Sequence, residues 1–377
     1  MMPPLALYIH FPWCVQKCPY CDFNSHALRG TMPENQYIQA LIADWQQDLE
    51  WIEGRAISSI FCGGGTPSLF SGDSIHHLLS TIRKSIPFTE DIEITLEANP
   101  GTLSRDSLSA LHAAGVNRLS IGAQSFQADK LRALGRIHGP EAIYQAMQLA
   151  KEAGFTRINL DLMYGLPQQT VADALYDLQQ ACALAPSHLS WYQLTLEPNT
   201  PFYRTPPPLP AEDEVMAIGE EGEAYLKTQA YQRYEISAFC RNADYCRHNV
   251  NYWQYGDYIG IGAGAHGKIT LENGTILRTA KKKHPKHYLE GQDFKQEELV
   301  VSQKDSLFEF MLNALRLQDK ISWALLEERS GWQRQNVFVY CDELVNKGLM
   351  EYNEESFYLT EKGKFFTNEA ISVFLPE

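Results

Sequence analysis

The feature of this sequence that most constrains its fold is an alternation of short apolar runs and longer amphipathic segments from Leu5 to about Thr195. The apolar runs are LALYIH, ISSIFC, IEITLEAN, VNRLSIGAQ, RINLDLMYG and HLSWYQLT. The segments between them, such as NQYIQALIADWQQDL and VADALYDLQQACAL, have the apolar spacing of helices. Six successive βα units with right-handed crossovers build a parallel sheet that curls into a full or partial barrel. We therefore predict an α/β fold, with a partial (β/α)6 barrel over residues 1–200.

Two smaller parts follow the predicted barrel. The proline-rich stretch Pro206–Pro210 interrupts the pattern, and a Glu-rich helix over about 212–228 then leads into YQRYEISAF, which predicts a flanking extension over 201–302. In the remaining segment, three helical patterns precede two short runs around a polar turn. This order predicts a small winged-helix-like α+β domain over 303–377. Its 8 basic and 13 acidic residues favour packing or protein contact over DNA recognition.

Composition and charge exclude several classes of protein. With 377 residues, 44% of them hydrophobic, the chain can bury a sizeable core and is not a disordered protein. The net charge of −14 argues against binding to nucleic acid or anionic lipid. The sequence has no signal-peptide pattern and no apolar run as long as a membrane span, so we expect a cytoplasmic protein without membrane insertion. The one basic block, from Lys281 to His287, predicts a solvated loop, with local attraction of an anionic ligand as the alternative.

Cysteine usage gives the first indication of chemistry. Three of the eight cysteines lie in CVQKCPYC, directly after the first predicted strand: Cys14, Cys18 and Cys21. In a cytoplasmic protein such a group indicates metal binding rather than disulfides. Three thiolates on one loop can hold three corners of a [4Fe-4S] cluster and leave the fourth iron without a protein ligand. The alternative is a zinc site completed by His10, Asp22 or His26, although the cysteine spacing favours iron–sulfur.

Polar and glycine residues recur at the ends of the predicted strands, where parallel βα folds bind their ligands. The second strand ends in GGGTPS, whose bare backbone suits the close approach of a small ligand. Glu97 of the third strand can accept from an ammonium group, and Gln124 and Asp161 of the next two strands can bind ribose hydroxyls. Arg136, after the fourth strand, can clamp a carboxylate. Each feature alone is also typical of a turn or a helix cap, but together they indicate a binding site.

These motifs together resemble the oxygen-independent coproporphyrinogen III oxidase family of radical SAM proteins, and within it the branch of haem chaperones of HemW type. The resemblance covers essentially the whole chain and is carried by YIHFPWC, CVQKCPYC, GGGTPS, EANPG, GAQSF, LGRIHG, NLDLMYGLP and HNVNYW. It implies that the three cysteines ligate a [4Fe-4S] cluster. It also implies contacts to S-adenosylmethionine from Tyr8, Tyr20, Gly64, Gly65, Thr66, Glu97, Gln124, Arg136, Asp161 and, as a weaker match, Thr195.

The stretch HNVNYW carries the residues that indicate haem. His248 supplies an imidazole that can ligate haem iron, while Tyr252 and Trp253 can stack on a porphyrin face. Without the resemblance, core aromatics and a hydrogen-bonded core histidine would be the simpler interpretation. With the resemblance, haem contact is our prediction, and His266 of GIGAGAHG is a second candidate ligand. That glycine-rich stretch is followed by no βαβ unit, which argues against a dinucleotide-binding loop.

Two features separate the chain from the true oxidases of this family. The oxidases typically carry a further cysteine two residues after the third one, where this sequence has Phe23, and a longer segment before the position of Tyr8. The resemblance therefore implies a chaperone that binds haem and transfers it to acceptor haem proteins, such as membrane-bound respiratory enzymes or haem-storage proteins, without oxidising coproporphyrinogen. The alternatives are an oxygen-independent coproporphyrinogen III dehydrogenase, which decarboxylates propionate chains by radical chemistry, and a zinc-stabilised interaction protein.

Overall fold

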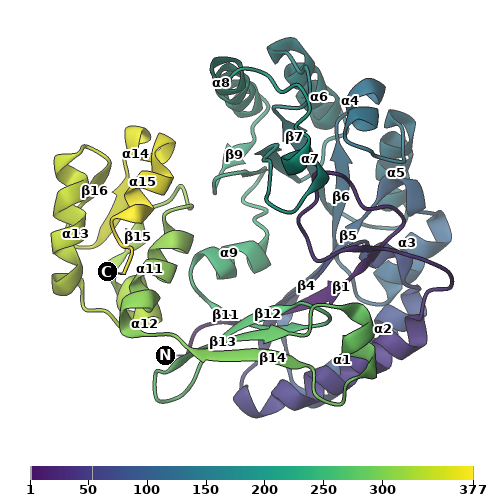
Figure 1. Cartoon of the computed structure of the whole chain (residues 1–377), viewed down its shortest axis with the longest axis horizontal. Coiled ribbons are helices and arrows are strands. Elements are labelled where there is room, and N and C mark those ends of the chain that lie inside the picture. Colours follow the sequence, from purple (N-terminus) through teal and green to yellow (C-terminus); the bar gives the residue numbers. More distant parts are fainter. Residues whose placement is uncertain (1, 53, 377) are drawn as a thin grey trace.

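The computed structural model describes residues 2–52 and 54–376. Within these residues a twelve-stranded sheet curves into an arch that is open on one side (Figure 1). Its strands lie in the order β14 (Lys295–Val300), β13 (Ile276–Lys281), β12 (His266–Thr270), β11 (Asp257–Ile261), β1 (Leu5–Phe11), β4 (Ile57–Gly64), β5 (Phe88–Ala98), β6 (Arg118–Gln124), β7 (Arg157–Tyr164), β8 (His188–Gln193), β10 (Ala238–Cys240) and β9 (Gln232–Arg233).

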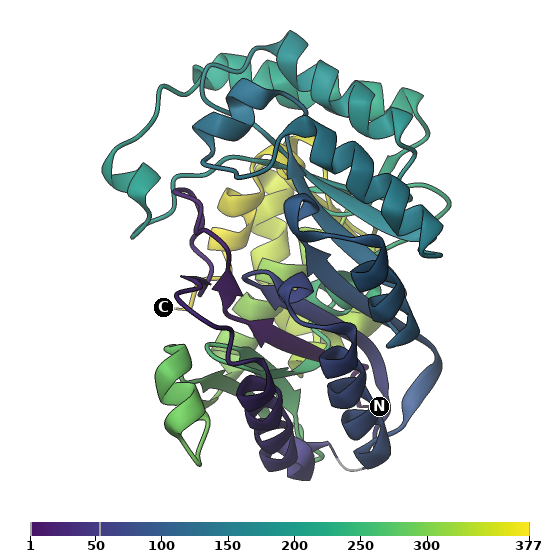
Figure 2. The same ribbon diagram turned by 90° about the vertical axis from the view of Figure 1, so that its right-hand side faces the viewer.

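The predicted partial (β/α)6 barrel is confirmed. The six apolar runs form β1, β4, β5, β6, β7 and β8, and each pairs in parallel with the next. The helices that connect them lie on the outer face of the sheet (Figures 1 and 2). They are α1 (Glu34–Asp48), α2 (Gly72–Ser85), α3 (Arg105–Ala113), α4 (Ala128–Ala133), α5 (Pro140–Glu152) and α6 (Val171–Ala183), with short 3-10 turns at Leu49–Trp51, Pro67–Leu69 and Pro100–Thr102.

A seventh parallel strand was not predicted. β11 comes from the extension and pairs with β1, so that Leu5 lies opposite Asp257. The strand is five residues long and fully buried, and its partner β1 lies near the N-terminal end of the chain, far away in the sequence. No local pattern marks such a pairing, because a short buried run can equally belong to a helix or a loop.

Polar caps begin several of the barrel helices where the apolar periodicity starts. The Ser71 hydroxyl accepts from the Ser74 amide at the start of α2. At the start of α6, Thr170 and Asp173 form a reciprocal capping box. These caps satisfy amides that the first turn of a helix leaves without partners. They therefore fix where the loops before α2 and α6 end, and the strand-to-helix loops form the mouth of the barrel.

The extension contains four helices among the described residues. They are α7 (Pro201–Arg204), α8 (Glu212–Thr228), α9 (Arg247–Trp253) and α10 (Pro285–Glu290). The predicted Glu-rich helix is confirmed as α8, which packs against α6. α9 carries the HNVNYW motif and contacts β4 and β11 of the sheet. The motif therefore lies against the barrel rather than on a separate lobe.

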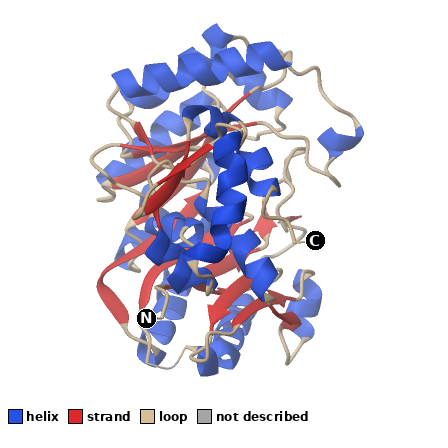
Figure 3. Cartoon of the chain, turned by 90° about the vertical axis from the view of Figure 1, so that its left-hand side faces the viewer, coloured by secondary structure: helices blue, strands red, loops and turns tan. Residues whose placement is uncertain are grey.

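The C-terminal part forms the predicted winged-helix-like α+β domain. Its helices are α11 (Gln303–Ala314), α12 (Trp323–Ser330), α13 (Arg334–Asn346), α14 (Glu361–Phe365) and α15 (Thr367–Ser372). Its small antiparallel sheet has the order β15 (Ile321–Ser322), β17 (Ser356–Leu359), β16 (Met350–Tyr352). The domain has an apolar core of its own around Phe310, Leu326 and Phe357. It lies beside the open side of the arch, as Figures 1 and 3 show.

One sequence prediction about charge is wrong. Lys281 does not belong to a solvated loop but is buried at the end of β13, where its ammonium group pairs with Asp44 Oδ1 at 2.5 Å and Asp48 Oδ2 at 2.7 Å. The residues that follow, from Lys282 onward, do reach the surface in part. Lys281 thus links β13 to α1 through a buried ion pair. In the described ranges, no helix is long and apolar enough to cross a membrane.

We expect Lys281→Met to lower the free energy of unfolding by about 3–5 kcal/mol, because the substitution leaves two buried carboxyl groups without their cation. Urea unfolding followed by circular dichroism measures this. Lys282→Met is the matched control, since Lys282 is only partly buried and its ammonium group donates to a backbone carbonyl. Equal unfolding midpoints for the two variants would show that the buried ion pair contributes nothing.

Candidate functional site

The cysteine loop leaves β1 at the mouth of the barrel. β2 (Trp13–Cys14) pairs in parallel with β3 (His26–Ala27), which closes the loop between them. The Thr66 amide donates to the Trp13 carbonyl over 2.7 Å, so the loop is tied to the glycine-rich end of β4. Its three thiols line one cavity of about 370 Å³, which we call the first cavity: Cys14, Cys18 and Cys21.

The first cavity also collects most of the residues predicted at strand ends. Its wall contains Tyr20, Gly64, Gly65, Thr66, Glu97, Gln124, Arg136, Asp161 and Thr195. They come together because the parallel strands β4 to β8 all end on the same side of the sheet. Tyr8 is the exception: it lines a neighbouring cavity, and its hydroxyl lies 3.0 Å from His10 Nδ1.

Two buried carboxyl groups dominate the electrostatics of the first cavity. Burial, and then the nearby Asp161, raise the pKa of Glu97 to about 8, although the Gly64 amide donates to Glu97 Oε2 over 3.0 Å. Burial also raises the pKa of Asp161, whose carboxylate accepts from Ser120 Oγ at 3.0 Å and from Asn159 Nδ2 at 2.8 Å. A cation beside these groups would lower both pKa values. The pair therefore suits a ligand that carries a positive charge.

Two polar atoms on the wall have no hydrogen-bond partner among the described residues. They are Gln124 Oε1 and Arg136 Nε, and both are buried. A buried polar atom without a partner costs about 1–3 kcal/mol, so both atoms favour a ligand that pairs with them. Arg136 Nη1 also lies 3.7 Å from Cys18 Sγ, which puts a cationic group beside the thiols. At Gly65 a Cβ atom would come within 2.4 Å of the Trp13 carbonyl oxygen, so only glycine fits there.

The thiols and their neighbours form a donor set that fits a metal cluster. Burial, with smaller contributions from the other two thiols, raises the pKa of Cys14 to about 11, and metal coordination deprotonates such groups. Across residues 2–52 and 54–376, no three His, Cys, Asp or Glu side chains converge as ligands of a single metal ion do. His10 is one candidate for completing a zinc site, but both of its ring nitrogens form hydrogen bonds within the protein. Nδ1 pairs with the Tyr8 hydroxyl and Nε2 with the Asn24 carbonyl oxygen.

A second cavity, of about 790 Å³, lies beside the first. Aromatic side chains and the His248 imidazole make up much of its wall: Tyr8, Phe61, His248, Tyr252, Trp253 and Tyr258. His10 and His266 line it as well. The two cavities share the residues Lys17, Asp22, Phe23, Gly64 and Glu97, so they have a common wall. The three residues predicted to contact haem, and the second candidate His266, therefore all lie in one cavity next to the cysteine loop.

His248 is placed as a neutral imidazole among these rings. Its ring centroid lies 5.2 Å from that of Phe61 and 6.4 Å from that of Tyr8. Burial lowers the pKa of His248 to about 3, so the ring keeps the lone pair that metal ligation requires. Its Nδ1 lies 3.5 Å from Ser59 Oγ. The indole Nε1 of Trp253 is buried and finds no partner in the described part of the chain.

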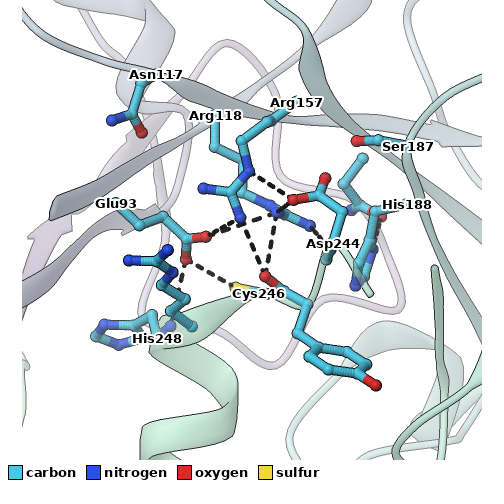
Figure 4. Close-up of polar contacts among 12 residues, drawn as sticks. Glu93, Asn117, Arg118, Arg157, Ser187, His188, Asp244, Cys246 and His248 are labelled. Atoms are coloured by element: carbon cyan, nitrogen blue, oxygen red, sulfur yellow. Dashed lines mark hydrogen bonds and ion pairs between the residues drawn. The ribbon is translucent and has the colours of Figure 1, made fainter. Parts of the chain in front are cut away.

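A buried ion network fixes the segment that carries His248 (Figure 4). Arg157 pairs with Glu93 Oε2 at 2.7 Å and with Asp244 Oδ1 at 2.6 Å. Arg118 lies 3.2 Å from the same oxygen of Asp244. The other oxygen of Glu93 accepts from the His248 amide at 3.3 Å. The start of α9 is therefore held against β5, β6 and β7 by charge pairs that are costly to break.

Several residues of these cavities were not predicted from the sequence. Tyr192 lines the first cavity from the end of β8, so the strand-end rule that selected Thr195 could have found it. Phe61 and Tyr258 line the second cavity from inside strands, where an aromatic residue indicates only a core position. Lys283 belongs to the basic block for which the sequence offered anion attraction as an alternative, but only the folded chain shows that it reaches the cysteine loop.

Comparison with known proteins agrees with this geometry. Residues 8–181 match the Radical SAM superfamily, and residues 301–366 match the HemN C-terminal domain. The solved structure of coproporphyrinogen III oxidase (HemN) from Escherichia coli is similar with a TM-score of 0.84 and 26% identity, over 99% of this chain and 90% of that one.

Curated relatives are closer in sequence. The protein named heme chaperone HemW in Haemophilus influenzae is 49% identical over 100% of this chain and 99% of its own length. The HemW proteins of Escherichia coli and Bacillus subtilis are 47% and 34% identical, over 100% and 99% of this chain and 99% of their own lengths. Matches of this extent, together with a radical SAM barrel whose cysteine loop and strand ends line one cavity, show that the chain belongs to the HemW family of the radical SAM superfamily.

Proposed function

We propose that the protein is a haem chaperone of HemW type, which binds haem in the second cavity and transfers it to acceptor haem proteins. The observation that supports this most is the second cavity itself, where a neutral, buried imidazole stands among aromatic rings beside the cysteine loop. Imidazole ligates haem iron, and aromatic rings pack on a porphyrin face. The names of the curated relatives, which match over almost their whole length, support the same function.

The proposal includes a [4Fe-4S] cluster and S-adenosylmethionine in the first cavity. Cys14, Cys18 and Cys21 would ligate three irons of the cluster. When bound, the cluster supplies a one-electron redox centre and one iron with an open coordination position. Glu97 would accept from the ammonium group of S-adenosylmethionine, Arg136 would bind its carboxylate, and Gln124 with Asp161 would bind its ribose hydroxyls. The unpaired buried atoms of Gln124 and Arg136 support this assignment.

A second candidate function is that of the oxygen-independent coproporphyrinogen III dehydrogenase, because the HemN structure is similar over almost the whole chain. Phe23 argues against it. This side chain, 57% exposed, lines both cavities at the position where the oxidases of the family typically carry a cysteine. A phenyl ring has neither a metal-binding atom nor an exchangeable proton. We therefore propose a protein that does not oxidise coproporphyrinogen.

The free thiols and the net charge indicate the compartment and the partners of the proposed chaperone. All eight cysteines are free in the structure, which suits the reducing cytoplasm. The acceptors would be haem proteins, such as membrane-bound respiratory enzymes or haem-storage proteins. Nucleic acid is not an expected partner, because the chain has a net charge of −14. We also propose three functional parts: a cofactor-binding barrel over 1–200, an extension over 201–302 that supplies the HNVNYW motif, and a C-terminal domain over 303–377.

Anaerobic reconstitution should load about four irons per chain with a cubane-type spectrum, because three thiols line one cavity. Cys18→Ala should abolish this loading, as measured by iron and sulfide analysis with the visible spectrum. Cys182→Ala is the matched control, since that cysteine lies on α6 away from both cavities. A native protein with one zinc ion and no iron would contradict the proposed cluster.

S-adenosylmethionine should change the electron paramagnetic resonance spectrum of the reduced cluster. We expect Glu97→Gln or Asp161→Asn to raise the S-adenosylmethionine concentration needed for half of this response at least roughly tenfold, without loss of iron. Each substitution removes a carboxylate from the cavity wall. Glu90→Gln, on the exposed part of the same strand as Glu97, should respond like the wild type. A wild-type spectrum that does not change at saturating ligand would rule out the proposed site.

The protein should bind haem and should not convert coproporphyrinogen III to protoporphyrinogen under reducing anaerobic conditions. His248→Ala should shift the Soret band of the haem complex and slow transfer to an apo-acceptor, with the iron–sulfur spectrum intact, because it removes the buried imidazole. His76→Ala, an exposed residue of α2, serves as control. Efficient turnover of coproporphyrinogen would favour the dehydrogenase, whereas unchanged haem binding in His248→Ala would move the ligand elsewhere, first to His266.

A further inference from the structure

The second cavity has two chemically different parts. Its aromatic part comes from β1, β4, α9 and β11. Apart from His10 of β1, Gly64 of β4 and Glu97 of β5, the rest of its wall comes from the cysteine loop and from the segment around β12 and the end of β13, and this part carries polar groups. We call this polar part the rim, and its members are Lys17, Asp22, Asn24, Gly264, His266 and Lys283. None of these rim residues is among those that the family resemblance assigns to the cluster or to S-adenosylmethionine.

The rim is held together by hydrogen bonds between distant segments. Asn24 Nδ2 donates to the Ala263 carbonyl over 2.9 Å and to the Lys283 carbonyl over 2.8 Å. A Cβ atom on Gly264 would lie 2.4 Å from Asn24 Nδ2, so this close contact requires glycine. The Lys17 ammonium donates to the Phe23 carbonyl over 3.0 Å. The two lysines are therefore carried by backbone segments that are fixed to each other.

The charges of the two rim lysines are not neutralised by the protein. In the part of the chain that the structure describes, neither Lys17 nor Lys283 forms an ion pair, whereas nearby Lys281 pairs with two aspartates. Asp22 is the other exposed charge of the rim and also has no ion-pair partner there. In a protein with a net charge of −14, two unpaired lysines beside an aromatic cavity favour a local anion.

We propose that Lys17 and Lys283 bind the two carboxylates of a flat, dicarboxylate macrocycle whose face packs on the aromatic part of the second cavity. The inference rests on the proposed function, since it names the groups that recognise the propionates of haem. Both propionates of haem lie on one edge of the ring, and both lysines lie on one rim of the cavity. A carboxylate moved out of water needs a charged or hydrogen-bonding partner, and lysine supplies both. The propionate edge then faces the cysteine loop, and the apolar edge faces α9.

The test compares haem with its dimethyl ester, in which both propionates are neutral, on the full-length chain with its cluster reconstituted. We expect the wild type to prefer the free acid at least roughly tenfold in Kd. Lys17→Met combined with Lys283→Met should remove this preference while ester binding stays unchanged, which is the signature of a direct contact in a double-mutant cycle. Absorbance titration at the Soret band measures both ligands.

Controls separate this inference from the proposed function and from damage to the cluster. Lys282→Met with Lys286→Met removes two lysines that do not line the cavity and should keep the preference for the acid. Because Lys17 lies in the cysteine loop, Lys283→Met alone is measured as well, and it should lower the preference with unchanged iron content. Equal affinity of the wild type for acid and ester, or an unaltered preference in the variants, would overturn the inference. Failure of the wild type to bind either porphyrin would instead overturn the proposed function.

Discussion

The buried ion network of Glu93, Arg118, Arg157 and Asp244 is the interaction on which the second cavity depends (Figure 4). Glu93 and Arg118 are almost fully removed from water, so each needs several partners to offset its desolvation. The partners come from three barrel strands and from the segment that leads into α9. Glu93 also accepts from the His248 amide. The network therefore joins the extension to the barrel at the point where His248 lines the second cavity.

The cysteine loop contributes to both cavities from its two sides. Its thiols line the first cavity, while Asn24 and Lys17 belong to the rim of the second. Asn24 is in turn held by the carbonyl groups of Ala263 and Lys283, which belong to the extension. The conformation of this loop is thus fixed to the barrel by the hydrogen bond to the Trp13 carbonyl and to the extension by those of Asn24. One loop therefore supplies part of the wall of both cavities.

The sequence predicted the parts of the structure that local patterns determine. Apolar periodicity located the six barrel strands and α8, and the rule that parallel strands end on one side brought Glu97, Gln124 and Asp161 together. It could not locate β11, because a buried run of five residues carries no period. It also misjudged Lys281, whose aspartate partners lie on α1, far away in the sequence. Pairings between distant segments depend on tertiary packing, which a single sequence does not display.

The interior of the second cavity is uncharged near neutral pH, and its charges stand at the rim. Burial raises the pKa values of Tyr8 and Tyr258 and lowers that of His248, so all three side chains are neutral at pH 7. In the proposed haem complex, binding inside the cavity would come from apolar burial and iron ligation, while charge would act only at the edge. A neutral imidazole that ligates haem iron can be replaced by the stronger iron ligands of another protein. In the proposed complex, an acceptor that offers such ligands would take the haem without unpairing a charge buried inside the cavity.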